Sequence, residues 1–222
     1  MIALIYTMLW DAKFPHTGFT RDHFTLANLC RAAFHTEDDY EPLKDWMRRA
    51  ADSMPEVKAA LSYCYDIKAQ VTRDGYVSSL NEPLNKYAVL PVAALTARSD
   101  IDLRKLVTSP DPYVIFVVTD DRSEVSNTIA TMFLNDLISA LTEYAKTQPN
   151  EMLPRDVILY VDEMGNLPPI PGLMKKITTL RSRKIWMQMA VQSLEQMDSV
   201  YGQKVTRTIL DNTNVQYFLG CR

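Results

Sequence analysis

The feature that most constrains the fold is a short apolar run at residues 157–161 that ends in two adjacent acids, Asp162 and Glu163. Five apolar or aromatic residues with β-branched ends are typical of a short buried strand. In open α/β sheets, ligands bind beside the carboxyl ends of the strands, so these acids stand where chemistry would be placed. The alternative is that both acids only begin a solvated loop, since short hydrophobic-acidic motifs also occur by chance.

The sequence before this run predicts a strand and a long helix. Residues 113–119 form an uninterrupted apolar run after the Pro110-Asp111-Pro112 turn, which is typical of a strand buried on both faces. The residues that follow place apolar side chains along one face of a helix: Val125, Ile129, Met132, Phe133, Leu137, Ala140, Leu141 and Tyr144. Strand, long helix and strand in succession predict a βαβ unit.

The alternation continues after the acids. We expect a helix at residues 174–183, a strand at residues 185–191 and a last strand at residues 215–219. Ser193 and Gln196 form a capping box that begins a further helix. Residues 99–222 are therefore expected to be α/β with a mostly parallel sheet.

The chain from residue 20 to residue 97 shows helical patterns and no strand signal. One face of a helix is marked by Leu43, Trp46, Met47 and Ala50. We expect a turn at Asp74-Gly75, and we expect Pro83 and Pro91 to divide the following segment into short helices. These patterns predict an all-α domain at residues 11–98.

Composition excludes several classes of protein. The net charge of −3 gives no global attraction to nucleic acid or membrane, although residues 174–207 carry seven Lys or Arg against two acids. The three cysteines and three histidines are scattered, so neither a disulfide framework nor a zinc site is predicted. No apolar run approaches the roughly 18 residues of a membrane helix. The composition is that of a globular protein expected inside the cell.

Polar residues at the predicted strand ends should meet, because the carboxyl ends of parallel strands converge. Asp162 would hold Mg²⁺, Glu163 would orient a water, and Gln192 could hydrogen-bond both that water and a phosphate oxygen. Thr119-Asp120-Asp121 would end the first strand. For an isolated Gln the simpler interpretation is a loop amide. Arg181 and Arg183 stand near a predicted helix C-terminus, where positive charge is stabilising, so a structural role is the simpler interpretation. Alternatively, one of them could reach a phosphate on a neighbouring subunit.

Four blocks of sequence resemble one family in order and spacing. They are Asp162-Glu163-Met164-Gly165-Asn166-Leu167-Pro168, Leu180-Arg181-Ser182-Arg183-Lys184-Ile185, Gln192-Ser193-Leu194 and Ile209-Leu210-Asp211-Asn212-Thr213. The family is that of the type IV secretion coupling proteins, the TraG/TraD-like conjugative DNA transfer ATPases. The resemblance implies a partial RecA-like P-loop NTPase domain at residues 99–222, its Walker B half, with an inserted all-α domain. Residues 1–10 would then be the end of a nucleotide-binding-domain helix.

The resemblance also implies functions for single residues. Asp162 would be the Walker B acid for Mg²⁺, and Glu163 the catalytic carboxylate, both at an ATP site. Gln192 would be a polar sensor, and Arg181 or Arg183 a trans-acting arginine of a homo-hexamer, with Arg181 favoured. Asn166 fits the block without a derivable chemical role.

The same resemblance implies partners and a location for the intact protein. It would be an ATP-driven translocase of single-stranded or plasmid DNA that recruits a relaxase or relaxosome and engages type IV secretion channel components. It would act at the cytoplasmic face of the inner or plasma membrane, and we expect the present fragment to be soluble and cytoplasmic.

One departure from the family stands out: no Gly-x-x-x-x-Gly-Lys-Ser/Thr loop occurs among the 222 residues. We expect the chain to be a fragment without the Walker A loop and membrane anchor, inactive as an ATPase alone and exposing apolar strand surface that promotes oligomerisation. Two alternatives stay open, a module that docks relaxase or DNA without catalysis, and a pseudo-ATPase scaffold.

Overall fold

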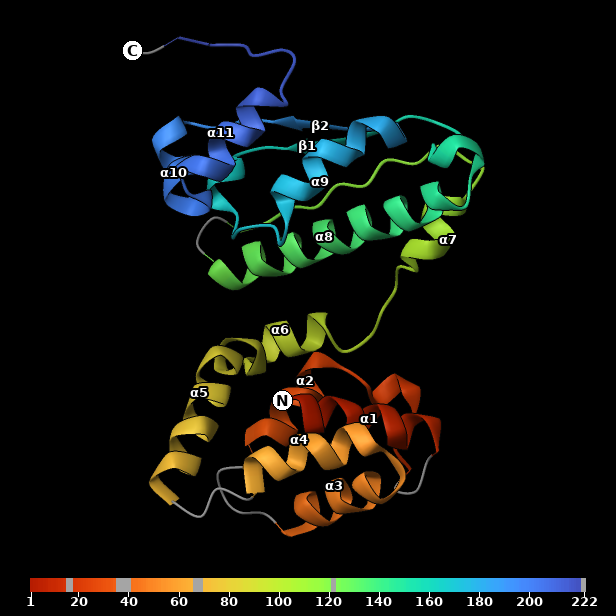
Figure 1. Ribbon diagram of the computed structural model, residues 1–222, viewed down its shortest axis with the longest axis vertical. Coiled ribbons are helices and arrows are strands. Elements are labelled where there is room, and N and C mark those ends of the chain that lie inside the picture. Colours follow the sequence, from red (N-terminus) through yellow and green to blue (C-terminus); the bar gives the residue numbers. More distant parts are fainter. Residues whose placement is uncertain (15–17, 35–40, 66–69, 121–122, 221–222) are drawn as a thin grey trace. The chain divides into compact units, whose positions relative to one another are not determined.

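The computed structural model describes residues 1–14, 18–34, 41–65, 70–120 and 123–220. They form two compact units, Met1–Asp100 and Ile101–Arg222, and each is described by itself (Figure 1). The acidic cluster at residues 37–39 and Asp121 lie outside the described residues.

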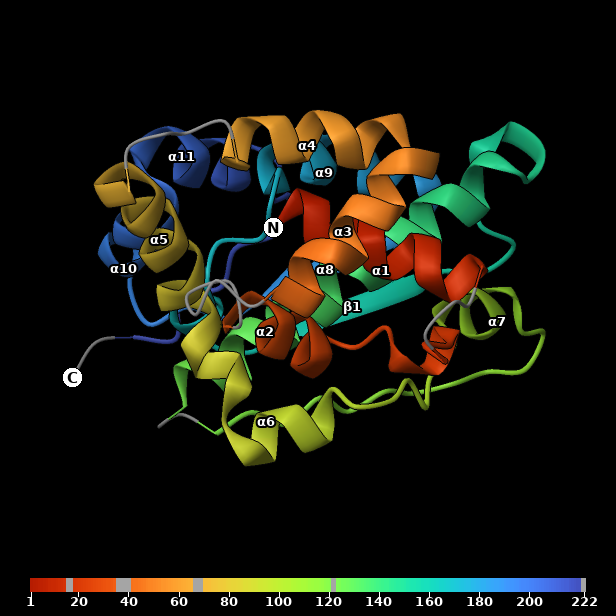
Figure 2. The same cartoon turned by 90° about the horizontal axis from the view of Figure 1, so that it is seen from below.

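The first unit is helical throughout its described part. Its elements are α1 (Ile2–Lys13), η1 (Arg21–His23), α2 (Leu26–Phe34), α3 (Glu41–Ser53), α4 (Pro55–Tyr65), α5 (Gln70–Ala88) and α6 (Leu90–Leu95). Figures 1 and 2 show α1, α3 and α4 packed side by side. The core of this unit includes Cys30 of α2 and Met47, Ala50 and Val57 of α3 and α4, each at most 4% exposed. The buried Asp11 carboxylate accepts a hydrogen bond of 2.7 Å from Trp46 Nε1, which ties α1 to α3.

Residues 1–10, expected to be the end of a helix, are helical from Ile2 onward. Ala3, Leu4 and Trp10 of α1 lie in the core of the helical unit. The assignment of this segment to a nucleotide-binding-domain helix stays a prediction.

The turn expected at Asp74-Gly75 is wrong, because α5 runs through both residues and through Pro83. A central Gly costs a helix about 1 kcal/mol and Pro about 3 kcal/mol, which tertiary packing can offset. Leu84 is buried in the core, and its carbonyl accepts a hydrogen bond from Cys30 Sγ at 3.8 Å. This packing onto α2 explains why α5 continues.

The second unit contains the sheet. Its elements are α7 (Leu103–Thr108), α8 (Glu124–Lys146), η2 (Pro149–Glu151), β1 (Val157–Val161), η3 (Met164–Asn166), α9 (Leu173–Leu180), η4 (Arg181–Arg183), β2 (Ile185–Met189), α10 (Leu194–Tyr201) and α11 (Gln203–Asp211). β1 and β2 are parallel, in a register that pairs Val157 with Ile185 and Val161 with Met189.

One face of this sheet is covered and the other is open. Leu159 and Ile185 pack against α8, and Val161 packs against α9, α10 and α11 (Figure 1). On the opposite face, Ile158 is 61% exposed and Tyr160 is 75% exposed. The strands therefore do not show the double burial expected for a parallel sheet.

The strands expected at residues 113–119 and 215–219 are not formed. Neither segment pairs with another strand, and Phe116, Val118 and Leu219 are 86%, 90% and 98% exposed. An apolar run becomes a strand only when a partner satisfies its backbone groups, and β1 pairs with β2 alone among the described residues. The parallel βαβ unit is consequently β1–α9–β2.

No helix within the described ranges is long and apolar enough to cross a membrane.

Candidate functional site

The backbone ladder between β1 and β2 continues past the assigned strand ends. Ala190 N donates to Val161 O at 2.9 Å, and Met164 N donates to Ala190 O at 2.9 Å. These two bonds hold the loop after β1 against the loop after β2. The carboxyl-terminal edge of the sheet is therefore where side chains from both loops meet.

Asp162 is the first side chain of this edge. It is exposed, and its Oδ1 accepts a hydrogen bond from the backbone N–H of Glu163 at 3.1 Å. A carboxylate oxygen is a hard ligand, and Mg²⁺ commonly takes one or two carboxylates while water and phosphates complete its shell. No group of three His, Cys, Asp or Glu suited to a metal occurs in the described part of the chain. A single acid is consistent with Mg²⁺ held together with a nucleotide.

Glu163 adopts the left-handed backbone conformation, with φ 50° and ψ 52°. Such a conformation costs a non-glycine residue about 1–3 kcal/mol and is concentrated at functional sites. Its carboxylate accepts two side-chain hydrogen bonds, one from Gln192 Nε2 to Oε1 at 2.8 Å and one from Asn166 Nδ2 to Oε2. The structure thus brings Asp162, Glu163 and Gln192 together at one edge of the sheet.

Two further polar side chains join this group. Asn166 Oδ1 accepts a hydrogen bond from Gln196 Nε2 at 2.6 Å, and its backbone carbonyl accepts one from Asn127 Nδ2 at 3.5 Å. The sequence places Asn166 in the same block as Glu163 but gives it no chemical role. Gln196 was predicted only as the last residue of a capping box. A polar side chain four residues after Gln192, in the first turn of the following helix, is the signal that could have pointed to it.

The two candidate arginines lie at the opposite end of the strands. Both belong to η4, which directly precedes β2, and a strand of five residues spans about 16 Å at ~3.3 Å per residue. Arg183 is held there: its guanidinium donates to Thr142 O at 3.4 Å and pairs with Glu151 at 3.2 Å. Arg181 is exposed. Neither arginine is brought to Asp162 within this chain.

Asp120 is likewise not at a strand end, because residues 113–119 form no strand. Its backbone N–H donates to Ser126 Oγ at 3.2 Å, at the beginning of α8. We therefore leave the 119–121 segment out of the candidate site.

Comparison with known proteins finds a family model that matches the part of the chain that carries the site. Residues 156–222 match the family model described as the TraM recognition site of TraD and TraG. A search of curated proteins gave no match. Among solved structures, the bacterial conjugative coupling protein TrwBΔN70, in a trigonal form in complex with sulphate, is similar with 19% identity and a TM-score of 0.59, covering 95% of this chain and 44% of that chain. The plasmid coupling protein TrwB in complex with ADP and Mg²⁺ gives the same identity and TM-score, with 95% and 45% coverage.

The chain is therefore similar to the TraG/TraD-like coupling proteins over residues 156–222. Its fold is that of part of a RecA-like domain together with an all-α domain, as predicted. It spans less than half the length of the TrwB chains it matches. The matched residues 156–222 contain every member of the candidate site except Asn127 on α8.

The half-buried Tyr201 side chain supports the loop that carries the site. Its hydroxyl accepts a hydrogen bond from Ile170 N at 3.4 Å and lies 3.9 Å from Met164 Sδ. Burial raises the pKa of the Tyr201 phenol, and the Ile170 N–H partly opposes this. Burial lowers the pKa of Lys176 on α9, against the attraction of Asp136.

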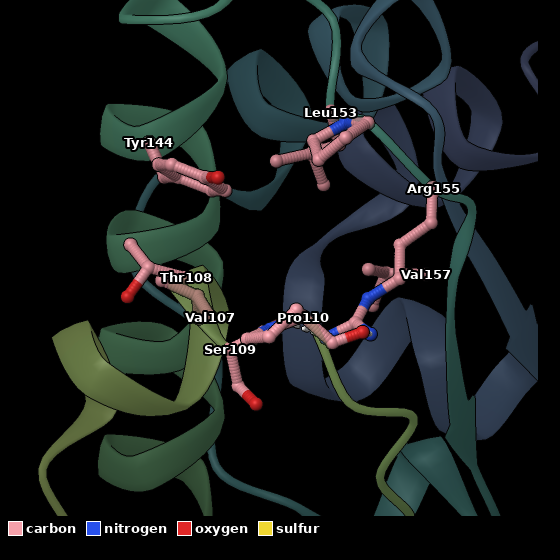
Figure 3. A pocket seen from close by; sticks show the side chains of 9 residues that line it. Val107, Thr108, Ser109, Pro110, Tyr144, Leu153, Arg155 and Val157 are labelled. Atoms are coloured by element: carbon pink, nitrogen blue, oxygen red, sulfur yellow. Dashed lines mark hydrogen bonds between the residues drawn. The ribbon is translucent and has the colours of Figure 1, made fainter.

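A hollow of about 360 Å³ lies at the other end of β1 (Figure 3). It is lined by Val107, Thr108, Ser109, Pro110, Tyr144, Leu153, Pro154, Arg155 and Val157. Figure 3 shows the Arg155 side chain extended toward Pro110. Its guanidinium donates to the carbonyls of Ser109, Pro110 and Asp111 at 2.6–3.1 Å and lies 4.9 Å from the Tyr113 ring centre. Three N–H groups of the Arg155 guanidinium thus hold the backbone at the rim of the hollow.

Proposed function

We propose that this chain is part of a TraG/TraD-like coupling protein that uses the carboxyl-terminal edge of β1 and β2 to hydrolyse ATP. The observation that carries the proposal is the meeting of Asp162, Glu163 and Gln192 from two strand ends, with Gln192 Nε2 bonded to Glu163 Oε1 at 2.8 Å. The similar TrwB structure in complex with ADP and Mg²⁺ supports a nucleotide and a divalent cation as ligands. Residues 99–222 would be the Walker B half of the nucleotide-binding domain.

Each side chain has a distinct role in this proposal. Asp162, exposed beside the strand end, would hold Mg²⁺ directly or through water. Mg²⁺, when bound, neutralises charge on the transferring phosphoryl group. Glu163 would orient the attacking water. An ionised carboxylate has about four acceptor positions, so the bonds from Gln192 and Asn166 leave capacity for that water.

The hydrolysis balances with these groups. A water oxygen forms a bond to the γ-phosphorus while the bond from that phosphorus to the β,γ-bridging oxygen breaks, which leaves ADP and inorganic phosphate. Glu163 would accept a hydrogen bond from the attacking water and take up its proton, which would then pass to solvent. Gln192 keeps the Glu163 carboxylate turned toward the strand edge and can donate its second N–H to a phosphate oxygen.

A neighbouring subunit would supply a positively charged arginine side chain to the phosphates. Arg181 lies at the far end of the strands and is exposed, whereas Arg183 is tied to Thr142 and Glu151. This distribution supports Arg181 as the residue that reaches a phosphate of the adjacent protomer in a homo-hexamer. An arginine acting in trans on a phosphoryl group typically accelerates hydrolysis by 10³–10⁵-fold.

Hydrolysis would drive transfer of single-stranded or plasmid DNA, with its relaxase, toward type IV secretion channel components at the cytoplasmic face of the membrane. The family description, the TraM recognition site of TraD and TraG, favours a second function within the same residues. We propose that residues 156–222 also recognise a TraM-like relaxosome protein. The two functions would link substrate docking to the nucleotide site.

Hydrolysis is tested on the protein made from the complete open reading frame, because the 222 residues include no Walker A motif. We expect Mg²⁺-dependent release of phosphate from ATP that single-stranded DNA stimulates. A full-length protein without Mg²⁺-dependent hydrolysis would show that the proposed activity is wrong and would favour the pseudo-ATPase scaffold.

Recognition is tested separately on the 222-residue chain. Purified TraM from a related plasmid is titrated into the labelled chain at low salt, with an unrelated protein of equal charge as the control. Saturable binding to TraM alone is expected. Equal or absent binding for both proteins would remove the recognition function.

A further inference from the structure

Asn166 occupies the centre of the polar group at the sheet edge. It contacts the strand end through Glu163 Oε2, α10 through Gln196 Nε2 at 2.6 Å, and α8 through Asn127 Nδ2 at 3.5 Å. Its backbone N–H also donates to Glu163 O at 2.8 Å. One exposed residue thus links α8 and α10 to the loop that carries the Glu163 carboxylate.

The direction of each bond in this group is fixed by chemistry. An ionised carboxylate only accepts, so Asn166 must present its NH₂ to Glu163 and its Oδ1 to the other side. Oδ1 can then only accept, and it receives the NH₂ of Gln196. The chain of donors runs from Gln196 to Asn166 to Glu163 in one sense. A second chain, from Gln192, ends on the other oxygen of Glu163.

The Gln196 side chain does not make the hydrogen bond that a capping box predicts for it. In a capping box the last residue bonds back to the backbone of the first, here Ser193. Ser193 Oγ does accept from Gln196 N at 3.1 Å, which caps α10, but the Gln196 side chain turns to Asn166 instead.

Gly165 makes room for this arrangement. A Cβ at Gly165 would lie 2.5 Å from Gln196 Cδ and 2.6 Å from its Oε1. Any larger residue at position 165 would therefore displace the Gln196 amide. The backbone of the 164–166 turn and the side chain of α10 fit only with glycine between them.

We propose that Asn166 and Gln196 are positioning residues that fix the orientation of the Glu163 carboxylate and transmit the position of α10 to it. The inference rests on the proposed hydrolytic function for its consequence, but the coupling itself is a property of this chain. Glu163 stands in a left-handed conformation, and two amide chains, one to each oxygen, hold its carboxylate there. A shift of α10 on binding a partner would release one of them.

The coupling is tested by NMR on the 222-residue chain. Gln196→Met keeps the size of the side chain and removes the donor, whereas Gln203→Met makes the same exchange at an exposed position on α11. We expect Gln196→Met to shift the Glu163 carboxyl carbon and the side-chain amide signals of Asn166 and Gln192. Gln203→Met should leave all three unchanged. Unchanged Glu163 and Gln192 signals in Gln196→Met would overturn the proposal.

The functional consequence is tested on the protein from the complete reading frame. Gln196→Met should lower kcat for ATP hydrolysis about tenfold while KM stays within about twofold, because a misplaced catalytic group affects the chemical step. Gln196→Lys restores a donor toward Asn166 Oδ1 and should recover most of the loss. Gly165→Ala should reproduce the effect of Gln196→Met, and the double variant should be no worse than either.

The two failures are distinguishable. A wild-type protein that hydrolyses no ATP would overturn the proposed function, and the NMR result then decides the coupling alone. A wild-type protein that hydrolyses ATP, with Gln196→Met at the same kcat, would overturn the positioning role.

Discussion

Gln192 Nε2 donates to Glu163 Oε1 at 2.8 Å, although 29 residues separate the two in sequence. The bond exists because β1 and β2 are parallel neighbours whose following loops are joined by Ala190. A parallel pair brings both carboxyl ends to one edge, so the residue after one strand meets the residue after the other. This relationship turns two short polar motifs into one site.

Arg181 and Arg183 should respond differently to removal. Arg183→Ala breaks the contacts with Thr142 and Glu151 and should lower the free energy of unfolding by about 1–2 kcal/mol, whereas an exposed Arg181→Ala should change it by at most about 0.5 kcal/mol. Urea denaturation of the 222-residue chain checks both values. Equal losses would contradict the structural assignment of Arg183.

The trans role of Arg181 has its own readout. In assemblies of the complete protein, mixing Arg181→Ala protomers with Glu163→Gln protomers should restore part of the activity that each lacks. Some interfaces then pair an intact Arg181 with an intact Glu163. An Arg181→Ala protein with normal hydrolysis would be inconsistent with this role.

Arg155 should stabilise the α/β unit by holding the chain that leads into residues 113–119. Its guanidinium fork reaches three successive carbonyls, which the ammonium of Arg155→Lys cannot do together. We expect a loss of about 1–3 kcal/mol, since hydrogen bonds from charged groups contribute more than neutral ones. Thermal unfolding followed by circular dichroism measures it, with exposed Arg207→Lys as the matched control. A loss of stability no larger than that of the control would contradict a stabilising role for the three Arg155 hydrogen bonds.

The helical unit should lose stability at alkaline pH through Cys30. Burial raises the pKa of this thiol above its ordinary value of 9.0, so above pH 9 the unfolded chain releases a proton that the folded chain keeps. The stabilising contribution is complete below pH 9 and disappears as the pH rises through the folded pKa. Urea midpoints between pH 8 and pH 10.5 should fall more steeply for wild type than for Cys30→Ala. Urea midpoints that fall equally with pH in wild type and Cys30→Ala would contradict this contribution of Cys30.

The parts of this fold that depend on a local pattern of residues can be predicted from the sequence. The α3 face of Leu43, Met47 and Ala50 is buried as its spacing predicts, and β1 and β2 form at the two predicted runs. What the pattern cannot contain is pairing. Residues 113–119 have the composition of a strand, but a strand needs a neighbour, and none lies beside them among the described residues.

The site divides in the same way. Asp162, Glu163 and Gln192 follow from the rule that strand ends converge, which needs only the order of elements. Asn166 and Gln196 depend on which way two amide side chains turn across a loop and a helix, and no spacing rule fixes that. The strain at Glu163 and the close approach at Gly165 are likewise visible only in three dimensions.

The exposed apolar segments should promote self-association of the 222-residue chain. Phe116 and Val118 are 86% and 90% exposed in a segment with unpaired backbone, which is a template for strand pairing. We expect light scattering to show concentration-dependent oligomers that Phe116→Lys with Val118→Lys reduces. Val71→Lys, at a residue 86% exposed in the helical unit, is the control and should have no effect. A monodisperse wild-type monomer would contradict this expectation.

The rate of ATP hydrolysis by the protein from the complete reading frame, carrying Glu163→Gln, tests the proposed catalytic site most directly. This change keeps the shape of the side chain and removes the charge that would accept the proton of the attacking water. The matched control is Asp156→Asn, at the opposite end of β1, where the side-chain oxygen still accepts from Trp186 Nε1. We predict that kcat falls at least about 10²-fold for Glu163→Gln, within the range that a general base contributes, and stays within about twofold for Asp156→Asn. Normal hydrolysis by Glu163→Gln, or equal losses for both variants, would contradict the assignment of the catalytic site.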